Sequence, residues 1–159
     1  MKPDDPRVVR TRRGDFRLHL PDAERDVLRS LPGQLRELLM TEDPALERLF
    51  PPAYPDDQAR NREYQDLVQA DLTASHLSSI DVMEATIDAD RLDEDQLVAW
   101  MGAINDLRLV LGTRLDVTEE LYEEGMPESD PRMPSFVLYV YLGWLEEQVV
   151  EALASEPDA

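Results

Sequence analysis

The sequence has 159 residues, enough for one domain with a buried core, and 42% of them are hydrophobic. Its formal net charge of −19 argues against nucleic-acid binding by the whole surface, because phosphate contacts need clustered Lys and Arg. The sequence contains no cysteine, which excludes disulfides, thiol catalysis and cysteine–zinc sites.

The first elements in the chain lie in an arginine-rich arm. Residues 1–36 hold nine basic and six acidic residues, whereas residues 37–159 hold seven and 29. Apolar residues alternate with polar ones around Phe16 and Leu18, and Gly14 suits a turn, so residues 7–20 predict a short β-hairpin. Such a hairpin must pack on helices to be stable. The candidate contacts with a partner or with nucleic acid are Arg10, Arg12, Arg13 and Arg17.

A first helix is expected from Pro21 to about Met40, with proline at its first position and acids in its first turn. The Pro32-Gly33 pair predicts a kink or a break near Leu31, because proline removes a backbone donor and crowds the preceding turn. A short helix capped by Asp43 should follow over residues 43–50, and three prolines then predict an extended stretch over 51–55.

Two long helices are expected in the middle of the chain. The first covers residues 56–86, and its apolar side comprises Tyr64, Leu67, Val68, Leu72, His76, Ile80, Met83 and Ile87. The second begins after Asp93, which forms a capping-box pattern with Gln96. Its apolar stripe comprises Leu97, Trp100, Ile104, Leu107, Leu111 and Leu115.

The last part of the chain should hold an acidic loop and one more helix. Residues 116–134 predict a loop with one helical turn at 118–124, and residues 134–153 predict a helix that is apolar nearly all round. Such a helix is either the central helix of the domain or part of a subunit interface. We expect a homodimer, with an interface formed by Phe136, Tyr139, Val140, Tyr141 and Trp144.

Together these elements predict a mainly α fold, with about five helices in an orthogonal bundle and a short N-terminal β-hairpin. The predicted domain covers residues 1–155, with the hairpin at 7–20 and the helical body at 21–153, and residues 156–159 should form a disordered tail. The start MKPDDPRVV lacks the apolar core of a secretory signal, and the longest apolar run is too short to span a bilayer. A cytoplasmic protein without membrane contact is expected.

Motifs that carry chemistry are missing from the sequence. His19 and His76 lie far apart without metal-ligand spacing, so His76 is interpreted as a packed or hydrogen-bonded residue of an apolar stripe. Residues 88–95 resemble a calcium loop only loosely, since they lack its glycine and place Leu92 at a ligand position. No phosphate-binding loop, nucleophile elbow or dinucleotide fingerprint is present. We therefore predict no catalytic residues, no metal and no cofactor.

Polar residues interrupt the apolar stretch between residues 97 and 115. Asn105 and Arg108 lie on one side of the expected helix, beside the core stripe. Arg108 can pack its stem there while its head reaches a carboxylate or helix-end carbonyls. A buried polar network of Asn105 and Arg108 that fixes helix register is the preferred interpretation, and a partner-binding patch is the alternative.

The segments LRSLPGQLRELL, DPALERLFPPAYPDD, LVAWMGAINDLRLVLGTRLDVTEE and YLGWLEEQVVEAL resemble an actinobacterial family of domains of unknown function. That family includes AosR-type proteins (actinomycete oxidative stress regulators), often encoded near ClpS. The resemblance implies a helical cytoplasmic regulator whose partner is a protein such as a sigma factor or another part of the transcription machinery. In redox-responsive members the switch is attributed to cysteines, so that mechanism does not carry over.

The predicted function is therefore non-enzymatic regulation through protein–protein interaction, in transcription under oxidative stress. Two alternatives stay open. One is a transcriptional regulator that contacts nucleic acid through its arginine arm, and the other is a structural protein without a redox switch.

Overall fold

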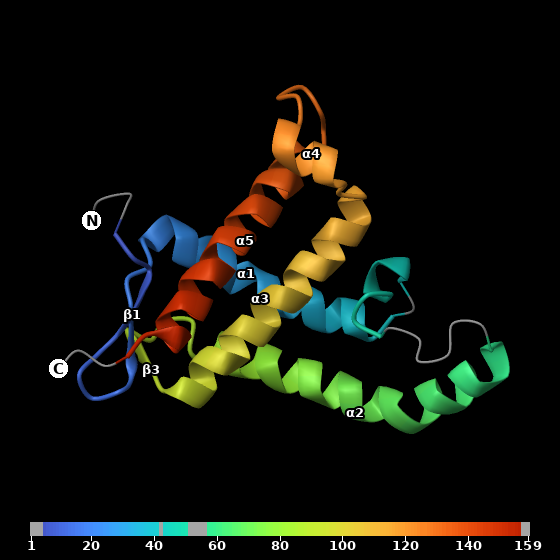
Figure 1. Ribbon diagram of the computed structural model, residues 1–159, viewed down its shortest axis with the longest axis horizontal. Helices are drawn as coiled ribbons and strands as arrows, with labels where there is room; N and C mark the ends of the chain where they lie inside the picture. Colours follow the sequence, from blue (N-terminus) through green and yellow to red (C-terminus); the bar gives the residue numbers. More distant parts are fainter. Residues whose placement is uncertain (1–4, 42, 51–56, 157–159) are drawn as a thin grey trace.

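A computed structural model of the chain describes residues 5–41, 43–50 and 57–156 (Figure 1). Its helices are α1 (Asp22–Leu39), α2 (Gln58–Ala85), α3 (Glu94–Leu115), α4 (Glu119–Glu124) and α5 (Met133–Ala154). Three short strands, β1 (Val8–Arg10), β2 (Phe16–Leu18) and β3 (Arg91–Leu92), form an antiparallel sheet in the order β1-β2-β3. A 3₁₀ turn, η1 (Pro44–Leu46), follows α1. The predicted mainly α class with an N-terminal hairpin is confirmed.

Helix α3 is central to the bundle. It packs against α2, α5, α1 and η1, and Figure 1 shows α1 crossing behind the α3–α5 pair. Its buried side chains point in several directions, for example Trp100, Ile104 and Val110. Helix α5 packs on α3 and β1 and leaves Val137 and Val150 exposed. Of the two alternatives for the last helix, the central place in the domain is therefore taken by α3, and a subunit interface stays a prediction.

Asp43 and Asp93, the two capping residues that the sequence predicts, both cap the elements that follow them. Asp93 accepts a hydrogen bond from the backbone N–H of Gln96, whose side chain in turn accepts one from Asp93. Asp43 caps η1, and Thr118 caps α4. The predicted short helix over 43–50 is reduced to a 3₁₀ turn within Pro44–Leu46.

Pro32 does not break α1. The helix is continuous from Asp22 to Leu39, and Pro32 is fully buried within it. Proline costs the helix one hydrogen bond, but burial of the ring recovers apolar stabilisation at that position. Of the predicted kink or break near Leu31, the break is therefore wrong and the kink stays a prediction.

The hairpin is part of a larger sheet than the sequence suggests. Phe16 pairs with Arg10 on one side and with Leu92 on the other, and both Phe16 and Leu92 are buried. Strand β3 is not among the predicted elements, because a two-residue strand has no detectable alternation.

Helix α2 extends beyond the helices that pack against it. Figure 1 shows its N-terminal half running past the other helices. Ile80, Met83 and Ile87 are buried, whereas Leu67 is 78% exposed. The predicted apolar side is thus buried only toward its C-terminal end. The expected extended stretch at 51–55, the helix start at Asp56, the side chain of Tyr64 and residues 157–159 of the expected tail lie outside the described residues.

Candidate functional site

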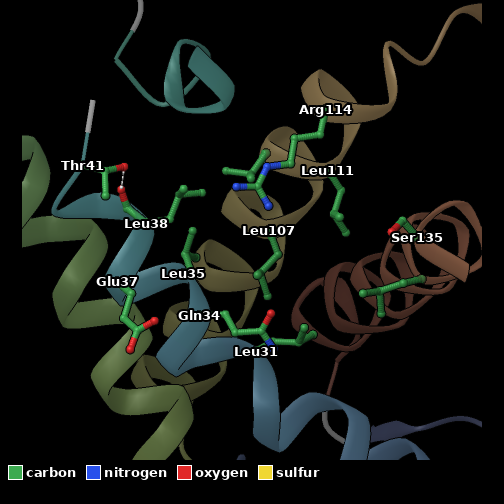
Figure 2. A pocket seen from close by; sticks show the side chains of 12 residues that line it. Leu31, Gln34, Leu35, Glu37, Leu38, Thr41, Leu107, Leu111, Arg114 and Ser135 are labelled. Carbon is green, nitrogen blue, oxygen red and sulfur yellow. Dashed lines mark hydrogen bonds between the residues drawn. The ribbon is translucent and has the colours of Figure 1, made fainter. Parts of the chain in front are cut away.

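A groove runs between α1, α3 and the first half of α5, and we call it the α1–α5 groove. It consists of two cavities of about 490 Å³ and about 430 Å³ that share Leu138. Figure 2 shows the larger cavity, with Leu31 and Leu35 of α1 on one side and Leu107 and Leu111 of α3 on the other. Hollows of this size suit several apolar side chains or a small ligand.

The groove exists because its two outer helices have other partners. Helix α1 packs mainly on α2, whereas α5 packs mainly on α3 and β1. Neither helix therefore fills the space between them. On α1 the groove residues recur at helical spacing: Ala23, Val27, Leu31, Gln34 and Leu38.

The two halves of the groove differ in polarity. The smaller cavity is lined almost wholly by apolar groups, among them Val27 and Val137, which are 45% and 54% exposed. The larger cavity has a leucine floor and a polar rim of Gln34, Glu37, Thr41, Arg114 and Ser135. Large exposed aliphatic side chains that line a hollow are typical of a binding surface.

The arginines of α1 point away from the groove. Arg29 forms two 2.7 Å hydrogen bonds with Asp88, and Arg36 contacts Asp81 and Glu84 at 2.7 and 3.1 Å. These pairs hold the pKa of Asp88 below its ordinary value, chiefly through the hydrogen bond from Arg29. Since α2 and the loop after it take up these positive charges, the charged residue that α1 contributes to the rim of the larger cavity is Glu37.

A polar cluster closes the apolar end of the groove. The guanidinium of Arg7, a buried residue, donates to both carboxylate oxygens of Glu24 at 3.0 to 3.2 Å, and the hydroxyl of Tyr141 donates to the same carboxylate at 2.8 Å. Arg7 also lies 5.0 Å from the ring centre of Trp144. Burial and the bond to Glu24 raise the pKa of the Tyr141 hydroxyl, so it remains a donor.

A second polar pair fastens α2 to α3. His76 Nδ1 lies 2.7 Å from Oδ2 of Asp106, which is buried at 5% exposure, and His76 Nε2 lies 3.3 Å from the carbonyl oxygen of Leu49. The hydrogen bond to Asp106 raises the pKa of His76, and burial opposes that shift. The interpretation of His76 as a hydrogen-bonded residue is confirmed.

Arg108 bridges α3 and α5. Its Nη1 donates to Glu146 at 2.5 Å, and its guanidinium lies 5.5 Å from the ring centre of Tyr139. Gly143 makes this approach possible, since a Cβ there would lie 3.2 Å from Nη2 of Arg108. Burial disfavours the charge, but the bond to Glu146 raises the pKa of Arg108 overall.

Asn105 does not belong to this arrangement. Its side chain is exposed, so the expected network of Asn105 with Arg108 is corrected. The buried polar neighbour is Asp106, one residue further round the helix. The role of Arg108 in fixing helix register stays a prediction.

The arginine arm divides into anchored and free residues. Arg10 donates to the carbonyl oxygen of Leu153 and lies over the ring of Phe16. Arg12, Arg13 and Arg17 are exposed. Of the four predicted contact residues, one is therefore used within the fold and three face solvent.

Most of the predicted dimer residues pack within the chain. Phe136 is buried, and the hydroxyl of Tyr141 donates a hydrogen bond to Glu24. The rings of Tyr139 and Trp144 make cation–π contacts with Arg108 and Arg7, respectively. Val140 alone of the five is exposed, at 38%. The homodimer itself stays a prediction, and light scattering that gives about twice the chain mass of 18.2 kDa would support it.

Several residues of these sites were missed from the sequence. Asp106 lies three residues after Ala103 and four residues before Val110, so it shares a helix face with two apolar residues, both of which are buried. This spacing is the sequence signal that could have identified Asp106. Glu24 and Glu146 gave no signal, because they are two of 35 acidic residues in the chain.

Among the residues that the structure describes, no three His, Cys, Asp or Glu side chains converge in a way that could hold a metal ion. Within the same residues, no helix combines the length and the apolar character needed to cross a membrane.

Comparisons with known proteins connect this fold to one family. Residues 4–153 match the family described as "Domain of unknown function (DUF2017)". Over 130 residues the chain is 32% identical to a Mycobacterium leprae (strain TN) protein named "Putative oxidative stress regulator AosR", covering 70% of this chain and 59% of that relative. The chain thus matches less than two thirds of that protein's length. No solved structure matches the chain. The family resemblance seen in the sequence is confirmed.

Proposed function

We propose that this chain, which belongs to the DUF2017 family, is a non-enzymatic cytoplasmic regulator that binds another protein in the α1–α5 groove. The observation that carries the proposal is the groove itself. It is long, its walls are helical, and it leaves Val27 and Val137 exposed beside a leucine floor. Apolar hollows with a polar rim are typical of protein interfaces.

The name of the relative supplies the regulatory context. It supports a role in oxidative stress. The partner that we propose, the transcription machinery such as a sigma factor, comes from the family resemblance of the sequence. This chain contains no cysteine, so it would act without a thiol switch of its own.

A capture experiment from native lysate tests the proposal. We compare the wild-type chain with Val137→Glu, which places a charge in the groove, and with Val150→Glu, a site of similar exposure that lines no part of the groove. We expect a transcription component identified by mass spectrometry to be lost with Val137→Glu and retained with Val150→Glu. Equal recovery with both variants would refute the groove as the site.

A second candidate function is contact with nucleic acid through the exposed face of the sheet. Arg17 and Arg91 are register partners there, and Arg12 and Arg13 lie in the adjoining turn. Like charges directly opposite each other are destabilising. Asp15, whose Oδ2 lies 3.7 Å from Nη1 of Arg91, offsets part of this repulsion, and a bound anion would relieve the rest. A DNA mobility-shift assay at two salt concentrations tests this function. Absence of binding even at low salt would eliminate it.

A further inference from the structure

We infer that the occupant of the α1–α5 groove is an amphipathic α-helix of the partner protein, with an apolar stripe flanked by Lys or Arg. The inference rests on the proposed function and adds the chemistry of the partner. Three observations carry it: the nature of the walls, the length of the groove and the charge at its rim.

The walls favour a helical occupant. The groove is lined by side chains of α1, α3 and α5, whose backbone groups are bonded within their own helices. No lining residue lies on a described strand, so an extended peptide would find no strand edge to pair with. Its buried N–H and C=O groups would be unsatisfied, whereas a helix satisfies them internally.

The dimensions agree with a helix of several turns. The groove residues of α1 extend from Ala23 to Leu38, which at 1.5 Å per residue is about 22 Å. The two hollows, joined at Leu138, offer successive positions for apolar side chains. A partner helix of about 15 residues, with apolar residues recurring every three or four positions, spans this length.

The charge at the rim favours a basic partner. Arg25, Arg29 and Arg36 of α1 are bonded toward α2 and its C-terminal loop. Glu37 is exposed at the rim and forms no ion pair with the part of the chain that is described. Arg114, the cation at the rim, lies 3.5 Å from Asp43. With a net charge of −19, the whole molecule attracts cationic partners.

Designed peptides provide the test. The probe is a fluorescent 15-residue peptide with leucines at helical spacing and lysines beside them. One control has the same composition with the leucines dispersed, and another replaces the lysines by glutamates. We expect fluorescence anisotropy with the full chain to give at least about tenfold weaker binding for both controls, the equivalent of 1.4 kcal/mol.

Matched variants locate the site. Val137→Glu should weaken binding of the lysine peptide by about tenfold, whereas Val150→Glu should leave it unchanged. Glu37→Lys should weaken the lysine peptide and strengthen the glutamate peptide. Circular dichroism of each variant checks that the helices remain.

Three results would overturn the inference: equal binding of the dispersed-leucine peptide, equal effects of the two valine variants, or equally tight binding of a proline-containing peptide that cannot form a helix. If the peptides fail while lysate capture still depends on Val137, the helical basic occupant is wrong and the proposed function stands. If capture is also independent of Val137, both fail.

Discussion

At the scale of single residues, the described part of the chain concentrates its buried polar chemistry in a few pairs. His76 is placed between two acceptors, the Asp106 carboxylate at 2.7 Å and the Leu49 carbonyl at 3.3 Å. A carbonyl and an ionised carboxylate can only accept, so both ring nitrogens must carry a proton to satisfy them. The edge-on ring of Phe50 completes the contact. The pair therefore holds the segment after η1 against α2 and α3 while His76 is charged.

The raised pKa of His76 makes this contact dependent on pH. Its contribution to the free energy of unfolding should be complete below the ordinary histidine pKa of about 6.5 and be lost as pH rises through the higher folded value. NMR titration of a His19→Gln variant, which leaves His76 as the single imidazole, measures this pKa. We expect a midpoint above about 6.5 that falls on Asp106→Asn. A midpoint at or below 6.5 would contradict the proposed charge state.

Arg108 should stabilise the packing of α3 on α5. Arg108→Ala removes the 2.5 Å bond to Glu146, a pair in which the side chains are 29% and 16% exposed. We expect a loss of about 1 to 2 kcal/mol, which lowers Tm by roughly 2 to 8 °C at this chain length. Asn105→Ala is the control, since an exposed side chain should change stability by less than about 0.5 kcal/mol. Equal shifts from the two variants in a thermal melt would restore Asn105 to the network.

At the scale of elements, the helices tolerate residues that usually disfavour helix. Pro32 and Gly33 both lie inside α1, and Gly143 lies inside α5. The two glycines have opposite surroundings. A Cβ at Gly33 would meet nothing within 4 Å, whereas a Cβ at Gly143 would press on the guanidinium of Arg108. The same residue type is thus a replaceable position in one helix and a packing requirement in the other.

Alanine should therefore stabilise one helix and not the other. Gly33→Ala should raise the free energy of unfolding by about 0.5 to 1 kcal/mol, because it removes the backbone freedom of glycine without a clash. Gly143→Ala should give no such gain, since its methyl group displaces Arg108. Urea denaturation of both variants measures the difference. A larger gain at Gly143 would show that the Arg108 contact is dispensable.

At the scale of the whole molecule, many arginines are paired with acids, and the acids in excess give the protein a strong negative charge. Among the described ion pairs, Arg36 of α1 contacts acids of α2, and Arg29 contacts Asp88 in the loop that follows α2. Other pairs join Arg7 to Glu24 and Arg108 to Glu146. The remaining acids outnumber the bases and give a net charge of −19. Such self-repulsion favours expansion of the chain and steers cations toward it.

Salt should consequently stabilise this protein. Between about 10 mM and about 150 mM ionic strength the Debye length falls from about 30 to about 8 Å, which screens the long-range repulsion. Exposed ion pairs also weaken, but each contributes at most about 1 kcal/mol. We expect Tm to rise equally with NaCl and KCl in differential scanning calorimetry. A fall in Tm over this range would mean that attractive pairs outweigh the repulsion.

The sequence alone determined what depends on local chemistry. The capping residues Asp43 and Asp93 marked the starts of η1 and α3, because a side-chain oxygen and the N–H groups that it caps lie within one turn. Helical spacing identified the core face of α3, and alternation identified the hairpin. The helical class followed from these local patterns, whereas the family followed from the resemblance of whole segments such as LVAWMGAINDLRLVLGTRLDVTEE.

Only the tertiary structure decided which residues meet. Strand β3 depends on pairing with β2, and Pro32 is tolerated because its ring is buried. The pairing of Arg108 with Glu146, rather than with any other acid, is fixed by how α5 packs on α3. The α1–α5 groove likewise arises because α1 and α5 prefer other partners. Such contacts join residues distant in sequence, and a chain with 35 acidic residues carries no local signal of which one an arginine will reach.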